Sequence, residues 1–264
     1  MNWTLPGDST LPLITAEDHI KSAHGSDSPL RLPRTCVLFE MGMALSYLEE
    51  QFETVTLSQR LPCFLDNPRC IALKGHPGLC LTKGGYGAPA AVDTLETLRA
   101  LGVEQVVVAG LCGVFAREVQ VGDLLVPEKV LCEEGCSHHY WSDLRFVLPD
   151  RTLSEQAAAF FSGDFSVFTA PTVTTDAVYR QTFAKEAYWR EEGCAGVDME
   201  TSALLAVSRY YHMPAVSILL ASDKHPITQE EPPWAWGSGS FQETRRRFVQ
   251  KVVEFSLTLE NPGE

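Results

Sequence analysis

The feature that most constrains the fold of this chain is a series of short apolar runs that recur along it. Most of them lack the polar residue at every second position that a half-exposed strand carries. Such runs occur at residues 37–39, 79–82, 106–109, 124–126, 167–169 and 216–220. Because a strand of this kind has no solvent-facing side, the pattern predicts a sheet that is buried on both faces.

Helical patterns lie between several of these runs. Apolar residues recur at helical spacing over residues 43–52, 89–101, 177–191, 201–211 and 239–259. Strands that alternate with helices predict a three-layer α/β sandwich. In an open sheet of this kind, ligands bind beyond the carboxyl ends of the strands, so the polar residues that follow the apolar runs are the first candidates for a site.

Length and local composition predict a single domain behind an irregular arm. Residues 1–34 are rich in Pro, Ser, Asp and Thr and show little periodicity, whereas residues 35–264 carry the predicted strands and helices. A chain of 264 residues with 45% hydrophobic residues is typical of a folded globular protein.

The net charge argues against two classes of partner. At a formal charge of −13 the chain repels phosphate backbones and anionic lipid, so we expect neither nucleic acid nor a membrane as a partner. The sequence shows no charged-then-apolar leader and no run of membrane-spanning length, and the cytoplasm is the expected location.

The eight cysteines are predicted to be reduced core thiols, because several of them lie in or beside apolar runs. One cluster has a ligand-like composition, with Cys132, Cys136, His138 and His139 in a C-x3-C-x-H-H arrangement. This spacing is not a common zinc pattern, so no metal is predicted.

Two glycine-rich turns are candidate binding elements. In the first, Gly85, Gly87 and Ala90 make a loose dinucleotide-binding fingerprint, but Glu104 precedes the next strand and cannot reach a ribose at its far end. We therefore expect no cofactor. Backbone N–H groups at this helix start could hold an anion or a sugar oxygen, or the segment could be only a tight turn. The second turn begins at Gly110 after the most apolar run.

Carboxylates stand close to two elements that look buried. Asp198 and Glu200 precede the helix predicted over residues 201–211, and Asp223 follows the strand predicted over residues 215–222. Glu200 could be only a favourable charge at a helix start, and Asp223 only the cap of a following turn. The pair, rather than either acid alone, indicates a site.

The sequence resembles the nucleoside phosphorylase and nucleosidase superfamily, whose members cleave the N-glycosidic bond of nucleosides. The resemblance rests on TTDAVYR at residues 174–180, GVDMETSALL at residues 196–205 and ASD at residues 221–223. The first motif and the EGCSHHY block at residues 134–140 look most like the uridine phosphorylase-like subgroup. The resemblance implies a central mixed, partly barrel-like sheet, a small-molecule nucleoside as partner, and a homo-oligomer that is a dimer or a hexamer of dimers.

Roles for individual residues follow from the matched motifs. Glu200 matches the residue that binds the ribose hydroxyls, and Met199 the residue that packs against the sugar. Asp223 matches the residue that protonates the ring in purine-cleaving members, while Val178 and Tyr179 match residues that line the base pocket. Glycosidic cleavage needs a carboxylate near the sugar and a proton donor near the base, so Glu200 and Asp223 are the predicted catalytic residues. Asp223 favours a purine-like base, although the subgroup resemblance favours uridine.

The expected phosphate clamp is largely missing. The loop after the first strand reads FEMGMAL and has no arginine, and apolar side chains stand where the family has an arginine and a hydroxyl, at Val108 and Leu111. Arg60 is a candidate for the arginine that a neighbouring subunit donates. Glu40, predicted to lie just past the first strand, resembles the acid that activates water in the nucleosidases of the family.

The sequence therefore predicts an enzyme that cleaves a purine-like nucleoside by phosphorolysis or hydrolysis, with inorganic phosphate as an optional co-substrate. The region for the anion or nucleophile is predicted around Gly85, Gly87, Gly110, Glu40 and Arg60. The alternative is a non-catalytic nucleoside-binding protein that kept the pocket and lost turnover.

Overall fold

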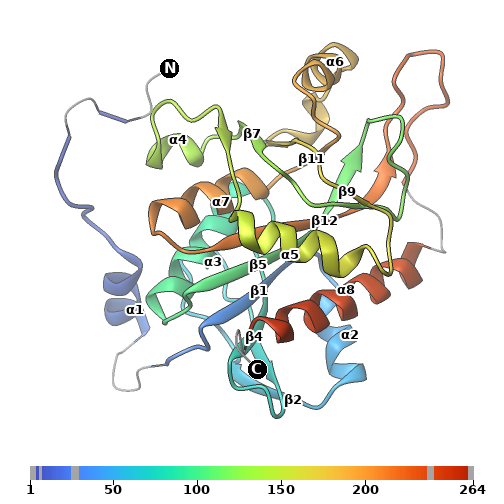
Figure 1. Ribbon diagram of the computed structural model, residues 1–264. Helices are drawn as coiled ribbons and strands as arrows, with labels where there is room; N and C mark the ends of the chain where they lie inside the picture. Colours follow the sequence, from blue (N-terminus) through green and yellow to red (C-terminus); the bar gives the residue numbers. More distant parts are fainter. Residues whose placement is uncertain (1–3, 6–7, 25–29, 237–240, 261–264) are drawn as a thin grey trace.

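The computed structural model describes residues 4–5, 8–24, 30–236 and 241–260, and these form a mixed α/β fold around one large sheet (Figure 1). Twelve strands belong to this sheet within the described residues. Their bounds are β1 Thr35–Glu40, β2 Thr54–Ser58, β3 Cys70–Leu73, β4 Leu79–Lys83, β5 Gln105–Val114, β6 Leu124–Leu125, β7 Val130–Glu133, β8 Phe146–Val147, β9 Val167–Phe168, β10 Thr172–Thr175, β11 Gly196–Asp198 and β12 Ala215–Lys224.

The sheet branches at β5 instead of closing into a barrel. Its main path runs β2-β3-β4-β1-β5-β11-β10-β7-β8, and β12 also pairs with β5 and continues through β6 to β9. The strands β4, β1, β5 and β12 are parallel. Their carboxyl ends therefore meet at one edge, and the register places Glu40 of β1 beside Gly110 of β5.

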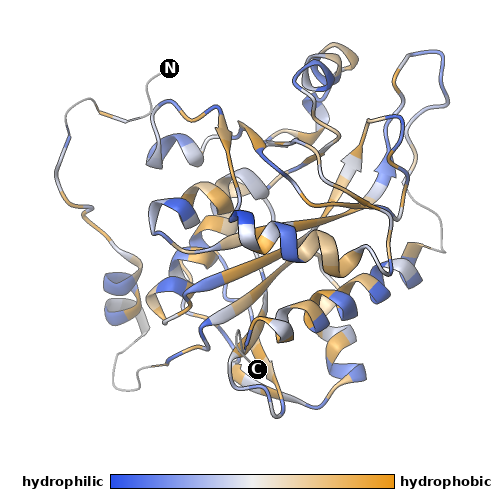
Figure 2. Cartoon of the chain, viewed as in Figure 1, coloured by the Kyte–Doolittle hydropathy of each residue, from blue (hydrophilic) through white to orange (hydrophobic). Residues whose placement is uncertain are grey.

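Helices cover both faces of this sheet. Their bounds are α1 Ala16–His24, α2 Ala44–Gln51, α3 Ala88–Ala100, α4 Ser137–Tyr140, α5 Arg151–Phe161, α6 Phe183–Glu191, α7 Thr201–Tyr210 and α8 Phe241–Thr258, with a short 3-10 helix at Val178–Arg180. Apolar side chains of α2, α5 and α8 pack on one face, and those of α3 and α7 pack on the other. Figure 2 shows the consequence in α8, where the side that faces the sheet is hydrophobic and the opposite side is hydrophilic.

Strand β1 shows why its sequence lacks polar alternation. Val37 and Phe39 join the core on the α8 side, while Cys36 and Leu38 join the core on the α3 side, and all four are fully buried. Alternating side chains of one strand thus fill two separate cores, so these four central positions must all be apolar. The predicted three-layer α/β architecture is confirmed.

The structure differs from the sequence-based expectations for two of the segments named above. The segment 1–34 is not wholly irregular, because α1 lies within it. The helix expected over residues 177–191 is a 3-10 turn followed by α6, which begins at Phe183. The start expected at residue 239 for the last helix lies outside the described residues, and the described helix begins at Phe241. Among the described residues, no helix combines the length and hydropathy needed to cross a bilayer.

Candidate active site

Glu40 is the last residue of β1 and not a residue beyond it, and its carboxylate is buried beneath the first glycine turn. A side chain at Gly84 would overlap the Glu40 carboxylate, so only glycine fits there without a shift. Neither carboxylate oxygen of Glu40 has a hydrogen-bond partner. Burial, followed by the charges of Glu200 and Asp198, raises the pKa of Glu40 well above its usual range. A buried polar group without partners is costly, which favours a ligand as the missing partner.

Glu200 lies immediately before α7 and connects this helix to the first glycine turn. Its Oε1 accepts a hydrogen bond of 2.6 Å from the backbone N–H of Gly87. Gly87 has a φ of 83°, a conformation that side chains other than glycine rarely adopt. Burial and the nearby Asp198 raise the pKa of Glu200 to about 8. The sequence correctly placed Glu200 at the helix start, and the contact with Gly87 brings two predicted site residues together.

Asp198 holds the start of α7 in place. It accepts hydrogen bonds from the hydroxyl of Thr174 at 2.5 Å, and from both the backbone N–H, at 2.8 Å, and the hydroxyl of Thr201. Burial raises the pKa of Asp198 despite these bonds. The two bonds from Thr201, the first residue of α7, show that Asp198 supports the start of this helix next to Glu200.

Asp223 is the penultimate residue of β12, and not a residue past the strand as the sequence indicated. A register shift between Ala221 and Asp223 places Asp223 opposite Gly113 of β5. Its Oδ1 accepts a bond of 2.5 Å from the Ser222 hydroxyl, and its Oδ2 accepts a bond of 2.7 Å from the indole N–H of Trp234. Burial alone would raise the pKa of Asp223, but hydrogen bonds from His225, Ser222 and Trp234 outweigh it and lower the pKa.

His225 extends the Asp223 cluster and was not singled out from the sequence. Its Nε2 lies 3.0 Å from Asp223 Oδ2, and its Nδ1 lies 2.7 Å from Oε1 of Glu186 in α6. Burial opposes charge on the ring, but the bonds to Asp223 and Glu186 raise the pKa of His225 to about 9. The signal available in the sequence was the spacing of His225 two residues after Asp223. No signal in the sequence pointed to Glu186, because this residue lies in α6, far along the chain from Asp223.

Gly85 and Gly110, the other predicted glycines, each allow a close contact that a side chain would prevent or crowd. A side chain at Gly85 would overlap Ala90 of α3, so Gly85 permits the helix to start close to the strand. A side chain at Gly110 would contact Leu219 and approach the Cβ of Glu40. Met199 is half-buried between Asp198 and Glu200. Gly110 therefore lies beside Glu40, and Met199 is the chain neighbour of both Asp198 and Glu200.

Three predicted site residues do not contact the acids in this single chain. Arg60 is exposed, and its guanidinium donates to the side chain of Asn67 at 3.1 Å. Val178 and Tyr179 lie in the 3-10 helix after β10, and the side chain of Tyr179 is 94% exposed. The structure therefore leaves all three roles as proposals.

The polar block near residue 134 has a structural explanation. Glu134 is buried, and it accepts hydrogen bonds from the backbone N–H of Ser137 at 3.0 Å and the hydroxyl of Ser202 at 2.9 Å. Glu134 therefore links α4 to α7 through these two hydrogen bonds. No group of three or more His, Cys, Asp or Glu is arranged to hold a metal ion within the described residues, and this includes the cluster around Cys132 and Cys136.

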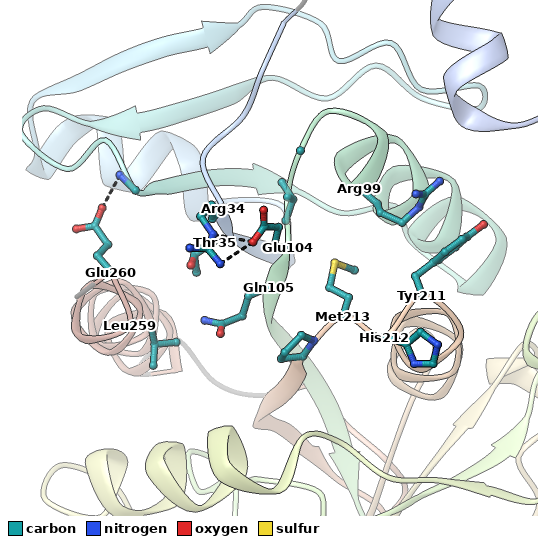
Figure 3. Close-up of a pocket in the computed structure, with 14 residues that line it drawn as sticks. Arg34, Thr35, Arg99, Glu104, Gln105, Tyr211, His212, Met213, Leu259 and Glu260 are labelled. Atoms are coloured by element: carbon teal, nitrogen blue, oxygen red, sulfur yellow. Dashed lines mark hydrogen bonds and ion pairs between the residues drawn. The ribbon is translucent and has the colours of Figure 1, made fainter. Parts of the chain in front are cut away.

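A cavity of about 710 Å³ lies at the opposite edge of the sheet from the acids (Figure 3). The amino ends of β1, β5 and β12 border it, and Arg34 and Glu104 pair across part of its wall at 2.6 Å. This cavity is not lined by Glu40, Glu200 or Asp223. In α/β sheets ligands bind at the carboxyl ends of strands, so the acids mark the candidate active site and this cavity does not.

Comparison with known sequences identifies the family of the chain. A family model described as "Phosphorylase superfamily" matches residues 48–258. A guanosine phosphorylase of Halorubrum lacusprofundi is 30% identical over 132 residues, which span 50% of this chain and about half, 55%, of that protein. A DeoD-type purine nucleoside phosphorylase of Clostridium perfringens is 25% identical over 210 residues, 74% of this chain and 87% of that protein.

Solved structures share the fold at low identity. The Toxoplasma gondii purine nucleoside phosphorylase has a TM-score of 0.72 at 17% identity, covering 88% of this chain and 92% of its own. A Vibrio fischeri uridine phosphorylase has a TM-score of 0.70 at 20% identity, and the match covers 88% of this chain and 93% of that protein. A Bacteroides thetaiotaomicron AMP nucleosidase has a TM-score of 0.65 at 19% identity, and the match covers 84% of this chain and 88% of that protein. The family match spans most of the chain and includes the helix start at Glu200 and the strand that carries Asp223. The chain therefore belongs to the phosphorylase superfamily, a family of enzymes that act on nucleosides.

Proposed function

We propose that this protein hydrolyses the N-glycosidic bond of a purine-like nucleoside, with water and not phosphate as the acceptor. The observation that carries the proposal is the Glu40 carboxylate, which is buried and has no hydrogen-bond partner. A carboxylate with a raised pKa is a stronger base than an exposed one when it is ionised, and it can accept a proton from an attacking water.

The charges around Glu40 favour a neutral acceptor. Glu200 and Asp198 both raise the pKa of Glu40, so three acidic groups act on one another at this edge of the sheet. A phosphate dianion placed among them would be repelled, although the charge of Lys83 partly offsets the effect of the other acids on Glu40. The clamp positions Val108 and Leu111 are apolar and offer no donor for phosphate oxygens.

The remaining acids fit the other half of the reaction. Bond cleavage builds positive charge on the sugar and negative charge on the leaving base. Glu200 would bind the ribose hydroxyls and stabilise the sugar, with Met199 packed against it. Asp223 would face the base and mediate its protonation, with Val178 and Tyr179 at the base pocket.

The identity of the base is part of the proposal. An acid at position 223 suits the ring nitrogen of a purine, and the names of the two sequence relatives support a purine over uridine. We further propose a cytoplasmic homo-oligomer, a dimer or a hexamer of dimers, in which Arg60 could reach a neighbouring site. The protein would use no cofactor, and phosphate would be dispensable.

Product analysis tests the acceptor directly. The protein is incubated with inosine, guanosine, adenosine and uridine, each with and without phosphate, and the sugar product is identified. We expect free ribose from a purine nucleoside at a rate that phosphate does not change. Ribose 1-phosphate with saturable phosphate dependence would overturn hydrolysis. Binding of nucleosides without any product would instead support the non-catalytic alternative.

A further inference from the structure

The ring of His225 lies between two carboxylates that come from different elements. Oδ2 of Asp223 in β12 is 3.0 Å from Nε2, and Oε1 of Glu186 in α6 is 2.7 Å from Nδ1. A neutral imidazole has one N–H and could donate to only one of them. Only the doubly protonated ring donates to both carboxylates when both are ionised, so this geometry selects the imidazolium.

The side chains of Asp223, His225 and Glu186, which form a triad, are largely shielded from solvent. The side chains of Asp223, Glu186 and His225 are 7%, 8% and 13% exposed. Phe115 of the segment after β5 packs near the His225 ring, with centroids 6.4 Å apart. Arg190 is a further charged group beside the triad, and its Nη1 is 4.0 Å from Glu186 Oε2. A proton held on Nε2 of His225 is therefore in direct hydrogen-bond contact with Asp223.

Asp223 by itself is poorly prepared to donate a proton. Three donors converge on its carboxylate, namely the hydroxyl of Ser222, the indole of Trp234 and the ring of His225. Hydrogen bonds to the ionised form favour that form, which is consistent with the lowered pKa of Asp223. The group that must protonate a leaving base is therefore held in its deprotonated state.

We propose that His225 stores the proton for the leaving base and delivers it through Asp223, with Glu186 holding the ring in position. This inference rests on the proposed function. As the bond between C1′ and the base nitrogen breaks, its electron pair goes to the base. Water forms the new bond to C1′ and gives a proton to Glu40, while the Nε2 proton of His225 passes to Asp223 and from Asp223 to the base, so Asp223 is ionised before and after the step. His225 ends neutral and Asp223 ionised, while Glu40 has gained the proton lost by water, so the protein as a whole gains and loses one proton.

Gly113 makes this arrangement sterically possible. A side chain at position 113 would overlap Nε2 of His225 and come within 3.2 Å of Asp223 Oδ2. The segment from Gly110 to Gly113, expected from the sequence to be a turn, is part of strand β5, and Gly113 there leaves room for the ring of His225. His225 does not touch the substrate in this scheme, so it is a positioning residue.

The test compares two leaving groups in His225→Gln and in a matched control. Inosine needs a proton on its base, whereas 4-nitrophenyl β-D-ribofuranoside releases a phenolate that needs little protonation. We expect His225→Gln to lower kcat for inosine about 10²-fold or more with little change in KM, because general acid catalysis typically contributes that much. The loss on the nitrophenyl riboside should be at least about ten times smaller. His76→Gln is the control, because His76 is also paired with a glutamate, Glu260 at 3.0 Å, at the other edge of the sheet.

The pH profile separates proton storage from a structural role. In the wild type kcat for inosine should fall as pH rises through about 9, where His225 loses its proton, and His225→Gln should lack this decline. Equal losses on both substrates, or a decline that persists in His225→Gln, would overturn the relay.

An NMR titration keeps the relay testable even if no nucleoside is cleaved. The imidazole of His225 should titrate near 9 in the wild type and at lower pH in both Glu186→Gln and Asp223→Asn. An ordinary value of about 6.5 in the wild type would reject the relay without bearing on the proposed hydrolysis. Absence of cleavage by a wild type whose His225 titrates near 9 would instead reject the hydrolysis alone.

Discussion

Gly84 and Glu40 fit together so closely that the glycine has no space for a Cβ beside the carboxylate. The backbone N–H of Gly84 also donates to the carbonyl of Phe39 at 3.0 Å, which fixes the first glycine turn over the end of β1. The turn therefore acts as a cover for a buried acid, and its glycines are required by packing and not only by a turn geometry.

Substitution of Gly84 by alanine should displace Glu40 and reduce activity. Because the added Cβ would overlap the carboxylate, the acid or the turn must shift, and we expect a loss of nucleoside cleavage on the order of 10-fold or more, as small misplacements of reacting groups are costly. Steady-state kinetics on inosine provide the measurement. Gly163→Ala is the matched control, since its Cβ would have no neighbour closer than 4.0 Å. Wild-type kinetics in Gly84→Ala would contradict this packing argument.

Removal of either predicted catalytic acid should reduce turnover while the fold remains intact. Glu200→Gln and Asp223→Asn should each lower kcat about 10²-fold or more, because both groups act on charge that develops in the transition state. Circular dichroism and thermal unfolding check the fold of each variant. Nearly wild-type activity in both variants would disprove the assignment of the site.

The buried acids should make the protein less stable as pH rises. The pKa of Glu200 is about 8 in the folded protein against 4.5 in the unfolded chain, so between these values the folded protein holds a proton that the unfolded chain releases. Stability must therefore fall as pH increases through this window. Glu40→Gln removes one of the interacting charges, so the decline of Tm between pH 5 and 8 should be shallower than in the wild type.

Other groups that contribute to this decline cancel in the comparison. His225 contributes stability that is present below pH 6.5 and lost as pH rises through about 9, and it does so in both proteins. The control is Glu53→Gln, which removes an exposed partner of Lys74. Parallel Tm curves for Glu40→Gln and the wild type would show that the acids are not coupled.

The cysteines should have no effect on stability through disulfides. All eight thiols are free, and seven of them are buried. Burial raises the pKa of Cys63 and of Cys132 to about 12, which keeps these thiols protonated and unreactive. Denaturation midpoints with and without reductant should therefore agree. A midpoint that depends on reductant would contradict the reduced-core prediction.

The sequence predicted those parts of the molecule that depend on local pattern. The apolar runs identified β1, β5 and β12 because their residues fill cores on both faces of the sheet. Glu200 could be placed because a helix start has a local signature. The short strand β8 has only two residues, too few for any periodicity to show, and no predicted run contained it.

The cluster around Asp223 could not be predicted in the same way. Its members Glu186, His225 and Trp234 are brought together by the path of the chain through α6 and β12, and no local pattern records that path. The length of β12 was also underestimated, because Asp223 and Lys224 are polar and yet continue the strand. Lys224 does so by donating to the carbonyls of Ala116, Arg117 and Val119, which replace solvent for its ammonium group.

The close approach of Gly113 to His225 has a consequence for how this protein can change during evolution. A mutation that gives position 113 a side chain is harmful as long as the imidazole occupies the same space. Once a smaller residue replaces His225, the same mutation meets no such obstacle, so the two effects cannot be additive. Gly113 and His225 should therefore be gained or lost as a pair among descendants of this chain, and a lineage that discards the histidine will be free to fill the gap and unable to return in a single step.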